Sequence, residues 1–123
     1  MVSFLPRLYA EGFTPLKSWG GGERSEDGVI TIPWPEYDEV VKDFFRTAAG
    51  ECWTDPGYLR KGAVRMLERA DLIRSADLGR IKTMLTYCVR GERFCSGHWN
   101  AMILGGHIRR LLERLAELKP EIA

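Results

Sequence analysis

Residues 37–48 read YDEVVKDFFRTA, and the spacing of apolar side chains in this stretch decides the class of fold. The apolar residues recur every three or four positions, which places them along one face of an α-helix. Because proline suits the first turn of a helix, we expect Pro33-Trp34-Pro35 to open this helix and Gly50 to end it. The apolar face consists of Tyr37, Val40, Val41, Phe44, Phe45 and Ala48.

Four further segments after Gly50 show the same helical period. Capping residues precede three of them: Thr54 (followed by Pro56), Ser75 and Ser96. Gly105-Gly106 separates the last two segments, and Pro120 is expected to end the final one. The expected helices cover residues 57–70, 76–90, 97–104 and 107–118.

The N-terminal part contains the only segments typical of β-strands. Two segments have apolar and β-branched residues typical of strands, with glycine-rich turns between them; they are residues 13–19 and 29–32. A short helix near residues 4–9 precedes them. An isolated hairpin is only marginally stable, so it must rest on helices. We therefore predict a mainly α-helical single domain, residues 1–123, with about five helices and a small N-terminal β-hairpin.

The composition is typical of a globular protein and excludes several classes. Hydrophobic residues make up 45% and charged residues 28% of the chain, which argues against disorder. No apolar run approaches the roughly 20 residues that cross a bilayer, and the start does not resemble a signal peptide. Three cysteines without paired spacing fit a reducing compartment. We expect a cytoplasmic protein without membrane contact.

The net charge of +1 conceals an asymmetry between the two halves of the chain. Residues 1–60 contain 6 Lys/Arg and 10 Asp/Glu, whereas residues 61–123 contain 12 and 7. Solvated helix faces that differ in sign would explain this distribution. A basic surface that meets an anionic partner, or head-to-tail self-association into a homo-oligomer, would explain it equally well.

A second informative stretch, residues 87–99, reads YCVRGERFCSGHW. Helical periodicity assigns Cys88 to the core, and Phe94 is interpreted as a packing residue. Arg90, Glu92 and Arg93 remain unexplained by packing or turn chemistry. Either they form a salt-bridge network that fixes the third long helix, or they form an anion pocket in which Glu92 orients an arginine.

Other chemistries have weaker support in this stretch. Cys88, Cys95 and His98 are metal-ligand types, but their spacing does not match known zinc sites, so we predict no metal and no cofactor. Nucleophilic catalysis by Cys95 lacks an identifiable acid to orient a histidine. A small enzyme using Glu92 or His98 as its acid–base group is a further alternative, although we expect a binding protein rather than an enzyme.

Nucleic-acid binding is another alternative, because two expected helices carry polar and basic outer positions. On the helix over residues 76–90 these are Arg80, Lys82, Thr83, Thr86 and Arg90, and on the last helix they are His107, Arg110 and Arg114.

The sequence also resembles a small prokaryotic family that is known only as a domain of unknown function. The resemblance rests mainly on the pattern Arg-x-Glu-Arg-Phe-x-x-Gly-x-Trp, which spans residues 90–99, and on Gly106-His107-Ile108. Ile32-Pro33, Tyr37, Val40 and Phe44 match further upstream. It implies that Arg90, Glu92, Arg93 and Trp99 act together, without implying an activity.

These observations lead to one functional expectation with two alternatives. We expect a small binding module that presents an Arg/Glu/Arg cluster to an anionic small molecule or a protein partner. Nucleic-acid binding and enzymatic activity are the alternatives. The expected ligand-binding residues are Tyr87, Arg90, Glu92, Arg93, His98 and Trp99.

Overall fold

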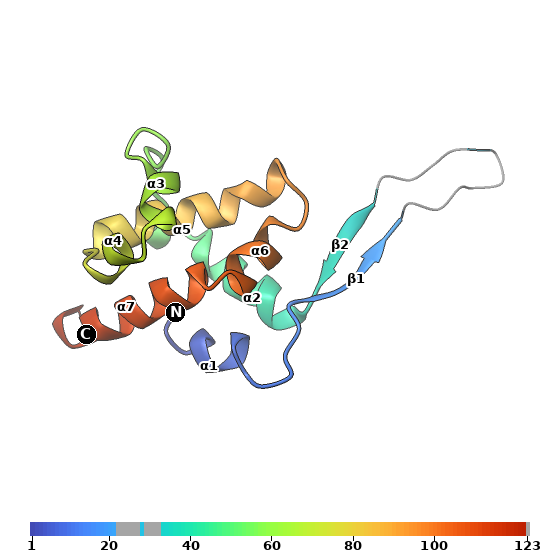
Figure 1. The fold of residues 1–123 in the computed structure, drawn as a ribbon, viewed down its shortest axis with the longest axis horizontal. Coiled ribbons are helices and arrows are strands. Elements are labelled where there is room, and N and C mark those ends of the chain that lie inside the picture. The colour runs from blue at the N-terminus through green and yellow to red at the C-terminus, as the bar shows by residue number, and fades with distance from the viewer. Residues whose placement is uncertain (22–27, 29–32, 123) are drawn as a thin grey trace.

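The computed structural model describes residues 1–21, 28 and 33–122, and in this part the chain is mainly helical with one small sheet (Figure 1). The predicted fold class is therefore confirmed. The helices are α1 (Phe4–Leu8), α2 (Glu39–Ala48), α3 (Ala63–Glu68), α4 (Ala70–Arg74), α5 (Leu78–Arg90), α6 (His98–Leu104) and α7 (His107–Ile122). Two 3₁₀ turns, η1 (Glu51–Trp53) and η2 (Gly91–Arg93), and two strands, β1 (Leu16–Gly20) and β2 (Trp34–Tyr37), complete the described elements.

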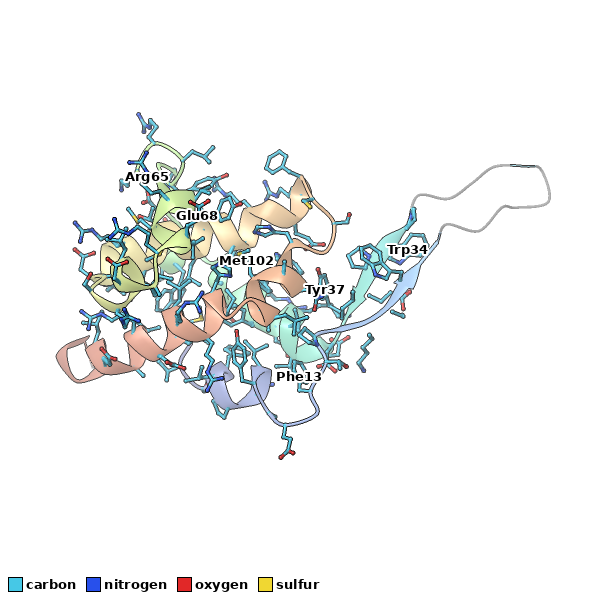
Figure 2. All side chains as sticks on the ribbon, in the orientation of Figure 1. Phe13, Trp34, Tyr37, Arg65, Glu68 and Met102 are labelled. Atoms are coloured by element: carbon cyan, nitrogen blue, oxygen red, sulfur yellow. The ribbon has the colours of Figure 1, made fainter. Side chains whose placement is uncertain are left out.

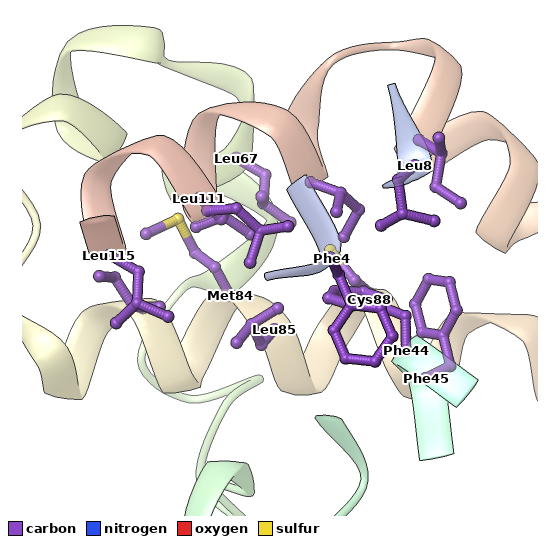
Figure 3. Close-up of a cluster of buried hydrophobic side chains, with 14 of the residues drawn as sticks. Phe4, Leu8, Phe44, Phe45, Leu67, Met84, Leu85, Cys88, Leu111 and Leu115 are labelled. Carbon is purple, nitrogen blue, oxygen red and sulfur yellow. The ribbon is translucent and has the colours of Figure 1, made fainter. Parts of the chain in front are cut away.

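Helix α5 lies at the centre of the molecule and contacts α2, α3, α6 and α7. Its residues Ile81, Met84, Leu85 and Cys88 are completely buried, as the periodicity predicts for Ile81, Leu85 and Cys88. Figure 3 shows how Phe44 and Phe45 of α2 and the leucines of α7 meet this helix. Each helix thus buries one apolar face in a shared core.

The hairpin is confirmed, but its second strand is displaced from the prediction. The predicted strand over residues 29–32 lies outside the described residues. Pro33-Trp34-Pro35 does not open helix α2, because β2 occupies Trp34–Tyr37 and pairs antiparallel with β1. A proline is tolerated there since each strand of a two-stranded sheet has a free edge. Helix α2 begins instead after Asp38, whose side chain accepts a hydrogen bond from the Val40 amide at 2.9 Å.

The helix predicted over residues 57–70 is wrong at both ends. Thr54-Asp55-Pro56 is followed by turns, and helix α3 starts only after Gly62, whose φ of 80° is the left-handed conformation that glycine tolerates. Arg69 is extended and separates α3 from α4. Leu59 would lie in the apolar face of a helix over residues 57–70, but it is 66% exposed because the chain forms turns there.

Three predicted helix boundaries also differ from the structure. Asp77 caps α5 by accepting from the Arg80 amide at 2.8 Å, whereas the Ser75 hydroxyl donates to the Asp71 backbone carbonyl at the end of α4. Gly97, not Ser96, directly precedes α6. Helix α7 continues past Pro120 to Ile122.

No helix in the described part of the chain combines the length and the apolar character needed to cross a lipid bilayer. The hairpin extends away from the helical body (Figure 1). Its base lies beside the start of α2, because Tyr37 ends β2 and Asp38 caps the helix.

Candidate functional site

Glu92 in η2 accepts hydrogen bonds from three groups that belong to two distant parts of the sequence. Its Oε1 accepts from the Tyr37 hydroxyl at 2.9 Å and from the Trp99 amide at 2.8 Å. Its Oε2 accepts from the Gly97 amide at 2.9 Å. The carboxylate therefore satisfies amides at the start of α6, which Ser96 does not do, and fastens this helix to the end of β2.

Tyr37 completes this connection between the hairpin and α6. Burial and the hydrogen bond to Glu92 both raise the pKa of Tyr37 above its usual range. A phenol is protonated at neutral pH in any case, and the raised pKa keeps Tyr37 a donor to the carboxylate in alkaline solution as well. Its oxygen also accepts from the Asn100 amide at 3.4 Å.

Trp99 lies between the core and the surface. Its ring stacks on Phe45 with centroids 4.4 Å apart and an interplanar angle of 5°, and its Nε1–H donates to the Val89 carbonyl at 3.0 Å. The centroid of the Tyr37 ring lies 5.3 Å from that of Trp99, and the two rings are tilted by 44°. These contacts fix the indole, so it presents a rigid aromatic surface.

His98 is buried, unlike a ligand-binding residue that faces solvent. Its ring packs edge-on against Tyr87 at 5.1 Å and lies so close to Gly91 that a methyl group there would overlap it. Burial lowers the pKa of His98, which favours the neutral imidazole. Within the described residues its Nε2 is buried and has no hydrogen-bond partner.

The two arginines of the predicted cluster point to different places. The Arg90 guanidinium lies over the ring of buried Tyr58, 5.4 Å from its centroid. Arg93 is exposed and forms no ion pair or hydrogen bond with any described residue. Glu92 pairs with neither arginine, so the expected orientation of an arginine by Glu92 is wrong; the carboxylate is occupied by main-chain amides and Tyr37. Phe94, expected to pack, is 84% exposed.

Two open cavities adjoin Glu92 and Trp99. The larger, about 670 Å³, lies at the base of the hairpin, where Figure 2 labels Trp34 and Tyr37. The smaller, about 540 Å³, lies against α2 and the end of α5. Both are bordered by Lys42, Glu92 and Trp99, so they are neighbours, and we refer to the two cavities together as the groove. The other residues are Lys17, Trp34, Pro35, Glu36, Tyr37, Glu39 and Ser96 in the hairpin cavity, and Phe45, Arg46, Ala49, Val89 and Arg93 in the helix cavity.

Three of the six predicted binding residues line this groove, namely Glu92, Arg93 and Trp99, whereas Tyr87, Arg90 and His98 line neither cavity. Sequence reasoning missed Lys42 and Arg46, because they lie on the outer face of an amphipathic helix and look like solvated charges. It also assigned Phe45 to the core alone. The alternation of polar and apolar positions in α2 does not reveal which outer positions border a cavity.

The proposed recognition surface on α5 is largely covered. Thr83 and Thr86 are each only 2% exposed, because the segment around Asp55 lies over them. The Thr83 hydroxyl donates to Asp55 at 2.6 Å, and the Thr86 hydroxyl accepts from the Asp55 amide at 2.8 Å. Thr83 and Thr86 are therefore unavailable for contact with a nucleic acid in the folded protein, whereas Arg80 on the same helix is exposed.

Arg114 of α7 contributes to structure, and Cys88 and Cys95 do not belong to a metal-binding cluster in the described residues. Arg114 donates to the Ala76 carbonyl at 2.8 Å and pairs with Glu117. Cys88 is buried, Cys95 is exposed, and no three His, Cys, Asp or Glu side chains of the described chain converge on one point.

The comparisons with known proteins supply a family but no activity. Neither the curated proteins nor the solved structures include a match to this sequence. A family model matches residues 1–121, nearly the whole chain, and its family is described as one of unknown function. The chain therefore belongs to the family of unknown function DUF6508.

Proposed function

We propose that this domain is a binding module whose groove beside α2 and α6 receives an acidic segment of a partner protein. Arg93 supplies the main contact to the anionic group. The observation that carries the proposal is an exposed guanidinium without a partner in the described residues, located at the edge of a cavity with an apolar floor.

Among the cations around the helix cavity only Arg93 is unpaired in the described residues, while the carboxylate of Glu92 in the same lining accepts three hydrogen bonds from the protein itself. Arg46 pairs with Asp43 at 3.0 Å and Lys42 pairs with Glu39, so these two cations are already compensated. Arg93 is not, and its planar guanidinium matches a carboxylate in a two-point contact. An incoming Asp or Glu side chain would gain this contact without displacing an existing ion pair.

The apolar lining favours a peptide over a small inorganic anion. Phe45, Val89, Ala49 and the fixed ring of Trp99 line the helix cavity beside Arg93. A partner segment with an apolar residue next to its acidic residue would bury apolar surface there. The cavities are open rather than enclosed, which suits an extended segment lying across the surface.

The other predicted residues support this groove indirectly. Glu92 and Tyr37 hold the start of α6, and hence Trp99, against α2. Glu92 is a positioning residue under this proposal, because its oxygens are occupied by donors of the protein itself. Tyr87 and His98 pack behind the turn that carries Arg93.

A phage-displayed library of random peptides tests the proposal. Peptides of about twelve residues span about 40 Å when extended, which is ample for one groove. We expect selection on the immobilised domain to enrich peptides that carry Asp or Glu beside an apolar residue. Fluorescence anisotropy of a selected peptide should show about tenfold weaker binding to Arg93→Glu, because repulsion replaces attraction.

Arg80→Glu is the matched control, since Arg80 is an exposed arginine without an ion pair in the described residues and lies at the opposite end of α5. It makes the same change in net charge, so affinity should stay within about twofold of the wild type if long-range attraction is screened by salt. Selected peptides without acidic residues, or equal losses in both variants, would overturn the proposal. Circular dichroism checks that each variant is folded.

A further inference from the structure

The two cavities of the groove differ in the charge that their ion pairs leave uncompensated. In the helix cavity the uncompensated cation is Arg93. In the hairpin cavity Lys17 pairs with Asp38 at 3.4 Å and Lys42 pairs with Glu39. Among the described residues that leaves the carboxylate of Glu36, which has no cationic partner, whereas Glu92 borders both cavities and does not distinguish them.

We propose that the hairpin cavity receives a basic side chain, Lys or Arg, of the same partner segment that places its acidic residue at Arg93. The groove would therefore bind a segment whose acidic and basic residues follow in this order more tightly than one with the opposite order. This inference rests on the proposed function, because it assigns the second contact of the same bound segment.

Glu36 provides the main negative charge for this contact. It is exposed on β2, and its Oε2 accepts a hydrogen bond from the Ser18 hydroxyl at 2.9 Å across the hairpin. That bond restrains the side chain at the cavity edge while leaving Oε1 free of any hydrogen bond within the described part of the chain. A carboxylate fixed in this way loses less side-chain entropy when it binds an ammonium or guanidinium group.

Aromatic rings around Glu36 add a second attraction for a cation. Trp34 is 47% exposed and lies across Gly20, where any side chain would overlap its indole. Tyr37 and Trp99 line the same cavity. A cation placed over the face of an indole is attracted by the electron-rich ring, particularly when the cation is an arginine or lysine side chain.

The three shared lining residues allow one extended segment to contact both cavities. Lys42, Glu92 and Trp99 border both cavities, so the cavities are close enough for one extended segment to reach both. The segment would then cross the rigid Trp99 ring between its two charged residues. Reversing its charges would place an acidic residue beside Glu36 and a basic residue beside Arg93, and both contacts would become repulsive.

Charge exchange between peptide and protein tests this inference. The probe is the peptide selected above, together with a version in which its single Lys or Arg is replaced by Glu. We expect the replaced peptide to bind the wild-type domain about tenfold more weakly. The Glu36→Lys variant should bind the replaced peptide more tightly than the selected one, which reverses the preference. Glu68→Lys is the control, because Glu68 is exposed and outside this groove.

The outcomes separate this inference from the proposed function. If acidic peptides bind and depend on Arg93, but carry no basic residue or show no reversal with Glu36→Lys, the charge-order inference fails and the proposed function stands. If Arg93→Glu also leaves binding unchanged, both fail. Reversal with Glu36→Lys but not with Glu68→Lys supports the inference.

Discussion

At the scale of single residues, the charged carboxylate of Glu92 accepts three hydrogen bonds, so replacing it with a neutral side chain should lower the stability of the protein. Glu92→Gln retains the shape of the side chain but turns one acceptor into a donor that faces an amide or hydroxyl. We expect the free energy of unfolding to fall by about 1–3 kcal/mol, measured by urea denaturation. The same change at exposed Glu68 should alter it by less than about 0.5 kcal/mol.

Tyr37 and Glu92 should be energetically coupled through the hydrogen bond between them. A double-mutant cycle with Tyr37→Phe and Glu92→Gln should give a coupling energy of about 0.5–3 kcal/mol. Additive effects of the two substitutions would show that the hairpin is not fastened to α6 through this carboxylate.

Gly91 is required by the space that His98 occupies rather than by its backbone conformation. Its φ of −60° is ordinary, but a methyl group would overlap the His98 ring. We expect Gly91→Ala to destabilise the protein by about 1–3 kcal/mol in thermal or urea unfolding. Gly79→Ala is the matched comparison, since that position lies in the first turn of α5 and has room for a methyl group. It should be neutral or stabilising by up to about 1 kcal/mol.

At the level of elements, Asp55 fastens the segment between α2 and α3 to the side of α5. Hydrogen bonds from Thr83, Lys61 and the Gly57 amide lower the pKa of Asp55 from 3.8 to about 2. The folded state therefore favours the carboxylate, and its contribution is complete above about pH 4 and is lost as the pH falls toward 2.

Asp55→Asn should consequently be less stable than the wild type at pH 5, with a difference that shrinks as the pH falls from 4 to 2. Urea midpoints measured at intervals across this range give the comparison. A difference that stays constant down to pH 2 would contradict the assignment of these hydrogen bonds to the charged form.

The helical elements were predictable where apolar spacing is long and regular, as in α2, α5 and α7. The prediction of one helix over residues 57–70 was wrong because Gly62 is left-handed and Arg69 is extended, and both residues interrupt the helix. The apolar residues of this segment nevertheless keep a helical spacing in the sequence. The start of α6 was found, but its cap was not, since Glu92 reaches it from the preceding turn. Local sequence signals do not record such contacts.

At the scale of the whole molecule, the sequence singled out residues 90–99, and the structure places only part of this turn along the groove. Of residues 90–99, Glu92, Arg93, Ser96 and Trp99 border the groove, whereas Arg90 lies over the ring of Tyr58 and His98 is buried. The rest of the groove lining comes from α2 and the hairpin. Tyr37 of the hairpin and Glu92 are 55 positions apart in the chain. Only tertiary packing brings these residues together.

The most direct test of the central claim is nuclear magnetic resonance of the domain during titration with the selected acidic peptide. Binding in the groove predicts shifts of the Arg93 side-chain Nε–H, the Trp99 indole N–H and the backbone amides near Lys42, while the Arg80 signals stay in place. Shifts confined to the basic turn of Arg60, Lys61 and Arg65, with Arg93 and Trp99 unchanged, would contradict it.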